Sequence, residues 1–206
     1  MPAIIGRKVG MTQVFGEDGV RVPLTVIEAG PCPVTQVKDE ERDGYRAVQL
    51  GYGAVRPSRL TSPQRGHLKK AGAPPVRHLH EFAPDEIGRE VAVGDVVTVE
   101  DFEPGQRVRV TGTSKGKGYA GTVKRHRFGR GPKTHGSHNI RQPGSIGAAA
   151  FPARVMKGLR MSGHMGNRTV TQRGLEVVDR DPSRNLLLVK GAVPGGVNGI
   201  VIVRPE

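Results

Sequence analysis

The chain has 206 residues, with 32 Lys and Arg against 19 Asp and Glu and a formal net charge of +13. Its length is enough for one sizeable hydrophobic core with an appendage, or for two small cores. The single cysteine, Cys32, excludes an internal disulfide and a zinc ribbon, and no window approaches the roughly 18 apolar residues of a membrane helix. We therefore expect a soluble cytoplasmic protein whose partner is a polyanion.

The first 112 residues predict a β domain. Short runs rich in β-branched residues alternate with turn sequences such as GEDG and ERDG, and this tight spacing is typical of a meander or a small barrel. Residues 62–72 predict one short helix, although Gly66 and Gly72 lower its helix propensity. The strand-like runs are 3–9, 11–15, 20–29, 32–39, 45–53, 78–82, 90–102 and 106–112.

Strand patterns return near the C-terminus, at 168–181, 186–193 and 199–205. Strands on both sides of a segment without a strand pattern imply one discontinuous β domain, residues 1–112 with 168–206, in which the final strands pair with the first. Residues 113–167 are then an internal extension. The predicted fold class is mainly β, a small barrel with a long, largely irregular extension.

The extension has an unusual composition. No acidic residue lies between Glu103 and Glu176, and these 72 residues hold 15 of the 32 Lys and Arg and 14 of the 30 Gly, which leaves the rest of the chain with a net charge of −2. Unbalanced charge and glycine both oppose the formation of a core, so we expect the extension to order only on a partner. The ordinary interpretation of such a charge run is a solvated face or a disordered tail.

Three features favour an RNA-binding segment instead. Glycines between the cations let the backbone approach sugar and phosphate, aromatic side chains offer stacking surfaces, and both ends are anchored to a folded body. The predicted RNA-binding residues are Lys115, Lys117, Tyr119, Lys124, Arg125, His126, Arg127, Phe128, Arg130, Lys133, His135, His138, Arg141, Arg154, Lys157, Arg160, His164 and Arg168.

Enzymatic and metal-binding alternatives have weaker support. GKGYAG, residues 116–121, matches the G-x-G-x-x-G phosphate loop, but neither an apolar-periodic helix nor an acidic residue about 20 positions on follows it. The histidines of the extension lack cysteine or carboxylate neighbours, so we predict no metal site. We find no enzyme signature and expect no cofactor. The open alternative is a nucleic-acid- or nucleotide-processing enzyme that uses this loop, with Cys32 or a histidine in its site; a DNA-architectural protein is a third, without a visible recognition helix.

Five motifs, in order along the chain, resemble one family. They are GRKVGMTQVF (6–15), GTSKGKGYAGTVKR (112–125), PGSIG (143–147), KGLRMSGHMGNRTVTQ (157–172) and NLLLVKGAVPG (185–195). Together they look like the bacterial large-subunit ribosomal protein three, of the universal L-three family. The resemblance implies a six-stranded barrel of the kind found in translation factors. It also implies a cytoplasmic, ribosomal location, with large-subunit rRNA and neighbouring large-subunit proteins as partners and no membrane or small-molecule substrate.

The resemblance further implies that the extension runs into the RNA toward the peptidyl transferase region, and that the family binds early in assembly near the 3′ end of that RNA. We predict that the middle of the extension, residues 143–155, is its tip, with Ser145, Ala148, Ala149, Ala150 and Phe151 wedged among bases. A short apolar helix or a protein contact is the alternative there. Some bacterial members carry a methylated glutamine just after GSIG; three alanines stand there in this chain, which implies that the modification is absent.

Overall fold

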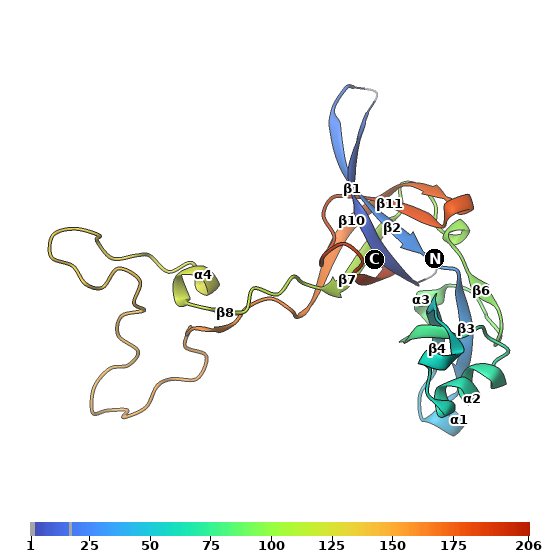
Figure 1. Cartoon of the computed structure of the whole chain (residues 1–206), viewed down its shortest axis with the longest axis horizontal. Coiled ribbons are helices and arrows are strands. Elements are labelled where there is room, and N and C mark those ends of the chain that lie inside the picture. The colour runs from blue at the N-terminus through green and yellow to red at the C-terminus, as the bar shows by residue number, and fades with distance from the viewer. Residues whose placement is uncertain (1–2, 17) are drawn as a thin grey trace. The chain divides into compact units, whose positions relative to one another are not determined.

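The computed structural model describes residues 3–16 and 18–206. The predicted mainly β class is confirmed (Figure 1). The chain divides into two compact units: unit 1 comprises the described residues up to Ser114 together with Thr169–Glu206, and unit 2 is Lys115–Arg168. The division into domains that fold independently, with boundaries at 112/113 and 167/168, stays a prediction and is addressed by an excision experiment below.

Unit 1 contains a closed six-stranded barrel. Its strands are β1 (Ile4–Phe15), β12 (Ile200–Pro205), β7 (Arg107–Thr113), β10 (Thr169–Asp181), β11 (Leu186–Lys190) and β2 (Arg21–Ala29), in that order around the barrel. All neighbouring pairs are antiparallel, and β2 pairs back with β1 to close the ring. The predicted pairing of the final strands with the first is confirmed, because β12 pairs with β1 and β11 with β2.

The barrel core follows the period of two expected of half-buried strands. Val108 and Val110 of β7 and Val201 and Val203 of β12 are buried, whereas the residues between them are more exposed. Burial of one such side chain is worth about 1.5–3 kcal/mol of transfer free energy. Cys32, which lies outside the barrel strands, is also fully buried, in the hydrophobic cluster that these barrel residues share with the rest of unit 1, as expected for a small apolar residue.

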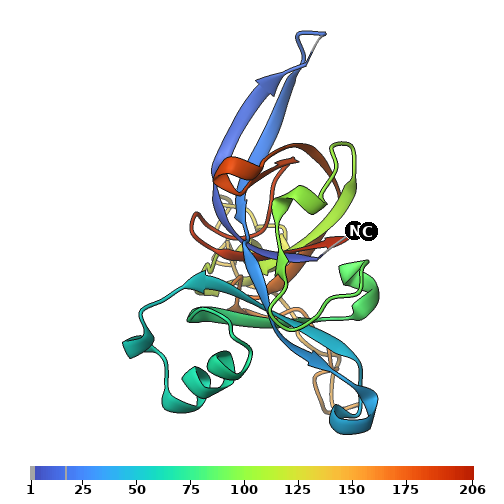
Figure 2. The ribbon, with the colours of Figure 1, turned by 90° about the vertical axis from the view of Figure 1, so that its right-hand side faces the viewer.

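A second sheet, which the local sequence pattern does not distinguish from the barrel, lies beside it in unit 1 (Figures 1 and 2). Its strand order is β5 (Val76–Phe82), β4 (Ala47–Ala54), β3 (Cys32–Lys38) and β6 (Val96–Val97). The accompanying helices are α1 (Glu40–Asp43), α2 (Ser62–Lys70) and α3 (Pro84–Ile87), with 3-10 turns at Pro57–Arg59 and Val99–Asp101. A third 3-10 turn, Pro182–Arg184, connects the barrel strands β10 and β11. The predicted helix at 62–72 is confirmed as α2, which begins with a capping box of Thr61 and Gln64.

Two strand predictions were wrong in their bounds. The run 90–102 contains only the two-residue β6, because a capping box of Thr98 and Asp101 starts a 3-10 turn there. The runs 3–9 and 11–15 are one strand, β1, with a bulge between Lys8 and Gly10 that a reading of the local pattern takes for a break. Within the described ranges, no helix is long and apolar enough to cross a membrane.

Candidate nucleic-acid interface

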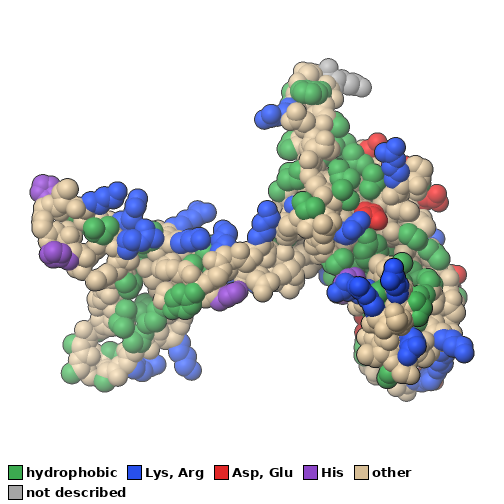
Figure 3. Space-filling view, viewed as in Figure 1, with side chains coloured by type: hydrophobic (Ala, Val, Ile, Leu, Met, Phe, Trp, Pro, Cys, Tyr) green, Lys and Arg blue, Asp and Glu red, His purple; other side chains and the backbone are tan. Residues whose placement is uncertain are grey.

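Unit 2 leaves nearly all of its side chains in solvent. Of residues 115–168, all of them described, only Ala120 and Thr122 are buried. The unit holds twelve Lys and Arg and no Asp or Glu, so no carboxylate within it neutralises them. In Figure 3, blue side chains and no red ones mark this part of the chain. The result is a strongly cationic surface with almost no core of its own.

A short antiparallel ribbon joins two segments of unit 2, the outgoing segment that follows β7 and the returning segment that leads into β10. β8 (Tyr119–Ala120) pairs with β9 (Gly163–His164), and the ladder continues as the Lys117 amide donates to the Met165 carbonyl and the Met165 amide to the Gly118 carbonyl, both at 2.9 Å. Beyond it, Gly166 has φ +74°, and a Cβ there would lie 2.1 Å from the Lys115 carbonyl oxygen. Only glycine fits where the outgoing and returning segments cross so closely.

The five-residue helix α4 (Thr122–His126) follows the ribbon and is fastened to the returning chain. Arg125 donates from Nη1 to the Met161 carbonyl at 2.7 Å, and Nε2 of His126 lies 3.0 Å from the same oxygen. The Arg125 guanidinium also packs on Gly163, where a Cβ would come within 3.0 Å of it. Arg125 and His126, predicted as RNA contacts, therefore hold the outgoing and returning segments together. The Arg125 guanidinium keeps further N–H donors for another partner.

The aromatic side chains of unit 2 differ in exposure. The Tyr119 side chain is 78% exposed, and its hydroxyl lies 2.9 Å from Ser162 Oγ. Phe151 is 89% exposed, whereas Phe128 is half-buried beside His126, with ring centroids 6.0 Å apart. Exposed rings have free faces on which bases can stack, and such stacking is worth about 1–3 kcal/mol per base.

The other predicted RNA-binding residues are spread along the unit, and the structure does not gather them into one pocket. Lys115 and Lys117 precede β8, Lys124 lies on α4, and His164 lies on β9. The outgoing irregular stretch carries Arg127, Arg130, Lys133, His135, His138 and Arg141, and the returning stretch carries Arg154, Lys157, Arg160 and Arg168. This arrangement suits contacts spread along a polyanion rather than one small ligand.

The predicted tip has little internal structure. Ser145 Oγ donates to the Gly147 carbonyl at 2.8 Å, Ala149 forms an isolated bridge with Pro152, and the bond between Phe151 and Pro152 is cis. Ala148, Ala149 and Ala150 are exposed. No helix forms over 143–155, so the apolar-helix alternative is wrong for this segment.

The features named for an enzyme do not form a catalytic site. Cys32 is fully buried, its thiol faces the Ile5 carbonyl at 3.4 Å, and burial raises its pKa to about 12, so it supplies no thiolate. The helix that follows GKGYAG has only five residues, TVKRH, and no apolar period, as expected, and Tyr119–Ala120 inside the motif pair antiparallel with β9. A dinucleotide loop instead joins a parallel strand to a long helix. Among the described residues, no group of three His, Cys, Asp or Glu could hold a metal ion.

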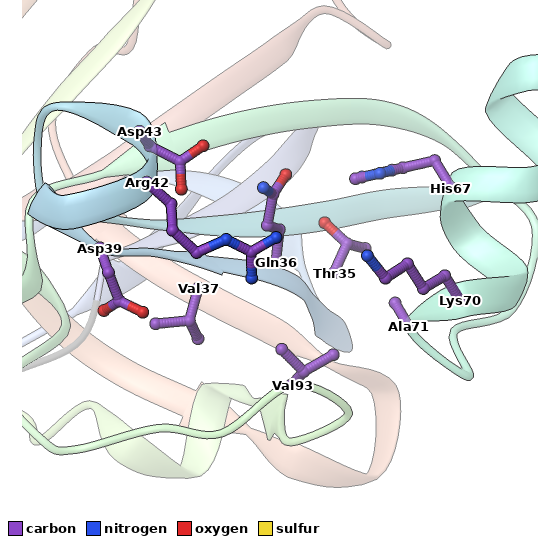
Figure 4. Close-up of a pocket in the computed structure, with 10 residues that line it drawn as sticks. All are labelled: Thr35, Gln36, Val37, Asp39, Arg42, Asp43, His67, Lys70, Ala71 and Val93. Atoms are coloured by element: carbon purple, nitrogen blue, oxygen red, sulfur yellow. The ribbon is translucent and has the colours of Figure 1, made fainter.

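A hollow of about 360 Å³ in unit 1 also lacks catalytic geometry (Figure 4). Asp39, Arg42 and Asp43 lie on one side of it, and His67 and Lys70 of α2 lie on the other. His67 Nε2 lies 2.8 Å from Gln49 Oε1, so an amide and not a carboxylate holds the imidazole. The only hydroxyl in the lining, Thr35, donates to the Gln49 side chain at 2.8 Å. No nucleophile and general base are therefore within hydrogen-bonding distance of each other there.

Sequence relatives identify the family. The family model described as "Ribosomal protein L3" matches residues 76–183. The protein named "Large ribosomal subunit protein uL3" of Thermosynechococcus vestitus is 52% identical, over 98% of this chain and 95% of that protein. Its namesake in Herpetosiphon aurantiacus is 53% identical, over 97% of this chain and 94% of that protein.

The chain belongs to the ribosomal protein L3 family. The resemblance drawn from the five motifs is thereby confirmed. Members of this family are structural components of the ribosome and not enzymes, which confirms the absence of an enzymatic role. The five motifs that suggested the family are spread from residue 6 to residue 195. The match with the relatives likewise extends over nearly the whole chain.

Proposed function

We propose that the chain is a structural constituent of the large ribosomal subunit and binds large-subunit rRNA directly through unit 2. One observation carries the proposal: twelve Lys and Arg stand on a unit with no carboxylate and only two buried residues, and the chain enters and leaves this unit through adjacent barrel strands. A unit that cannot form a core of its own gains order by contact with a polyanion.

Each group in unit 2 has a chemical task in this function. Lys and Arg neutralise phosphates, glycines such as Gly118 and Gly121 let the backbone lie against sugar and phosphate, and exposed Tyr119 and Phe151 stack on unpaired bases. The β8–β9 ribbon and the Arg125 contact with Met161 hold the base of the unit in one arrangement before RNA arrives, which lowers the entropy lost on binding.

The finer parts of the proposal concern place and time. We infer that unit 2 runs toward the peptidyl transferase region, that residues 143–155 are its tip, and that the chain joins the subunit early, beside other large-subunit proteins. The small exposed side chains Ala148, Ala149 and Ala150 support a tip that fits between RNA segments, because they add little volume and no charge.

Co-sedimentation with protein-free large-subunit rRNA tests the function. We compare the full chain with a variant in which Lys124, Arg127, Arg130 and Lys133 are changed to Gln. A control variant changes Arg21, Arg42, Arg107 and Arg173, four exposed unit 1 arginines, to Gln and so loses the same charge. We expect the unit 2 variant to bind at least about tenfold more weakly at 150 mM salt and the control to bind nearly as wild type. Equal binding by all three proteins would remove unit 2 as the RNA interface.

A further inference from the structure

A second segment without acidic residues lies in unit 1. Between Asp43 and Glu81 there is no Asp or Glu, yet residues 44–80 hold seven Lys and Arg and three His. Outside this segment and outside 104–175, the chain holds ten Lys and Arg and all 19 Asp and Glu. The near-neutral total of the body therefore conceals a cationic part and a strongly acidic part.

The structure places this segment on one part of the small sheet. It forms β4, the 3-10 turn Pro57–Arg59, α2 and most of β5. All seven of its Lys and Arg are exposed. Arg46 directly precedes β4, and we call the other six the lobe cations: Arg56, Arg59, Arg65, Lys69, Lys70 and Arg77. In Figure 3, blue side chains gather on the part of unit 1 that carries β4 and α2.

Helix α2 turns its cations outward. Leu68 is buried, and His67 contacts Gln49 of β4, so this side of the helix faces the sheet. Arg65 and Lys69, one turn apart, share the opposite side and project into solvent. Like charges at this spacing slightly destabilise a helix. The stability of α2 therefore does not account for this pair, whereas binding to an anion would.

Half of the 14 other cations of unit 1 form ion pairs within the fold. Arg7 pairs with Glu28 at 2.5 Å, Lys38 with Glu81 at 2.7 Å, and Arg109 with Glu86 at 2.6 Å. Arg204, Arg89, Arg184 and Lys190 also form ion pairs. Within residues 3–16 and 18–206, none of the lobe cations takes part in an ion pair. They are cations without an ion pair on a body in which seven of the 14 other Lys and Arg have one.

We propose that the lobe cations form a second RNA-binding surface, on the folded unit 1 and separate in sequence from unit 2. The inference rests on the proposed function, because that function supplies the polyanion. RNA fits better than a protein partner, because the lobe cations repeat the charge pattern of unit 2. Among residues 44–80, all of them described, the only large apolar side chains exposed are Tyr45, whose hydroxyl donates to Glu81, and Leu79 of β5. Protein interfaces instead have an apolar centre, and Lys is depleted in them.

Two anchors change what the chain can do in assembly. With a contact on each unit, the second contact forms at the high effective concentration set by the first, so the pair binds more tightly than either surface alone. The lobe cations lie on secondary structure that is already folded, so they give up less conformational freedom on binding than unit 2 does. They therefore act as the preformed part of the RNA interface.

Charge removal on the full chain tests the proposal. The lobe variant changes Arg56, Arg59, Arg65 and Lys69 to Gln, a residue that keeps α2 helical. Binding to protein-free large-subunit rRNA is measured from 50 to 300 mM salt. If these residues contact phosphates, the slope of log affinity against log salt becomes shallower by about 1.5–3.5, and affinity at 150 mM falls at least about tenfold. The control variant, Arg21, Arg42, Arg107 and Arg173 to Gln, loses the same charge and changes affinity less than threefold.

The unit 2 variant, with Lys124, Arg127, Arg130 and Lys133 changed to Gln, separates the two ideas. If it binds weakly while the lobe variant binds as wild type, the second surface is wrong and the proposed function stands. If neither variant loses affinity, both are wrong. A lobe variant that binds RNA normally but enters large subunits poorly would assign the surface to a protein and overturn the RNA inference. Lys69 and Lys70 should resist acetylation in the RNA complex and react in the free protein; equal reaction in both states contradicts the proposal.

Discussion

Replacement of Gly166 by Ala should open the base of unit 2 without touching the barrel. A Cβ on residue 166 would lie 2.1 Å from the Lys115 carbonyl oxygen and 3.1 Å from Gly116 Cα. Both neighbours are backbone atoms, so no side chain can move aside. The two segments must move apart where they cross, and the adjoining backbone hydrogen bonds of Met165 with Lys117 and Gly118 then break.

The cost follows from two terms. A side chain at φ +74° costs about 1 kcal/mol, and loss of two hydrogen bonds costs about 0.5–1.5 kcal/mol each. The sum, about 2–4 kcal/mol, corresponds to a fall of roughly 30- to 1,000-fold in the protection of the ribbon amides. RNA affinity should fall as well, because binding must then order the two segments and so costs more conformational entropy.

Hydrogen exchange of the free full-length protein measures this effect at Lys117 and Met165. Gly158→Ala is the matched control, because residue 158 also has positive φ, at +83°, but no atom lies within 4 Å of a Cβ there. We expect the control to leave the ribbon amides unchanged and both variants to keep the melting temperature of the barrel. Unchanged exchange at Lys117 and Met165 in Gly166→Ala would show that the close crossing does not exist in the free protein.

Four further predictions concern salt, the tip, pH and excision. With about 6–10 phosphate contacts in unit 2, RNA affinity should fall roughly a thousandfold or more between 50 and 200 mM salt in a filter-binding assay; a flat dependence contradicts the function. Ala149→Glu should slow late subunit maturation or change sensitivity to drugs of the peptidyl transferase region, while Ala149→Ser is mild; normal yield, peptide-bond formation and drug response for the Glu variant would place the tip in solvent. The hydrogen bond from Lys38 lowers the pKa of Glu81, so ionised Glu81 stabilises the fold fully above the ordinary carboxyl pKa, and this stabilisation is lost as pH falls through the lowered pKa. Glu81→Gln should therefore lower the melting temperature by about 1–3 °C at pH 7 and by progressively less below about pH 4. A difference in melting temperature that does not depend on pH would refute this. Because Thr113 and Thr169 are partners at the end of the β7–β10 ladder, a short Gly/Ser turn in place of residues 114–168 should leave barrel melting nearly unchanged but prevent RNA binding; an unfolded product would contradict the domain boundaries.

Most of the barrel could be predicted from local sequence patterns. Alternation along β7, β10 and β12 and the turn chemistry between strands mark these elements without knowledge of their partners. The prediction over 90–102 failed because β-branched residues also occur in turns, and only the Thr98 and Asp101 side chains determine that a 3-10 turn begins there. The second sheet was missed because it is continuous in sequence with the barrel strands, and no composition boundary separates the two.

The candidate interface divides in a similar way. Charge and glycine counts locate unit 2, since composition is a property of the chain itself. They cannot tell which cations are already engaged, and Arg125 holds the Met161 carbonyl from 36 residues away. The lobe cations were visible as an acid-free run from 44 to 80, but a net charge summed over the whole body averaged them against distant carboxylates.

The sequence by itself determined the β character, the cationic extension and the family, because each depends on residue types and their order along the chain. Tertiary structure alone decided that six strands close into a ring and that a second sheet stands beside it. It also decided that Arg7, Lys38 and Arg109 pair with Glu28, Glu81 and Glu86, while the lobe cations form no ion pair with any residue that the structure describes. The physical reason is range. Propensity and composition act between near neighbours in sequence. Barrel closure and several ion pairs instead join distant residues, such as Ile4 with Val203 and Arg109 with Glu86, and only a folded chain brings these within a few ångströms of one another.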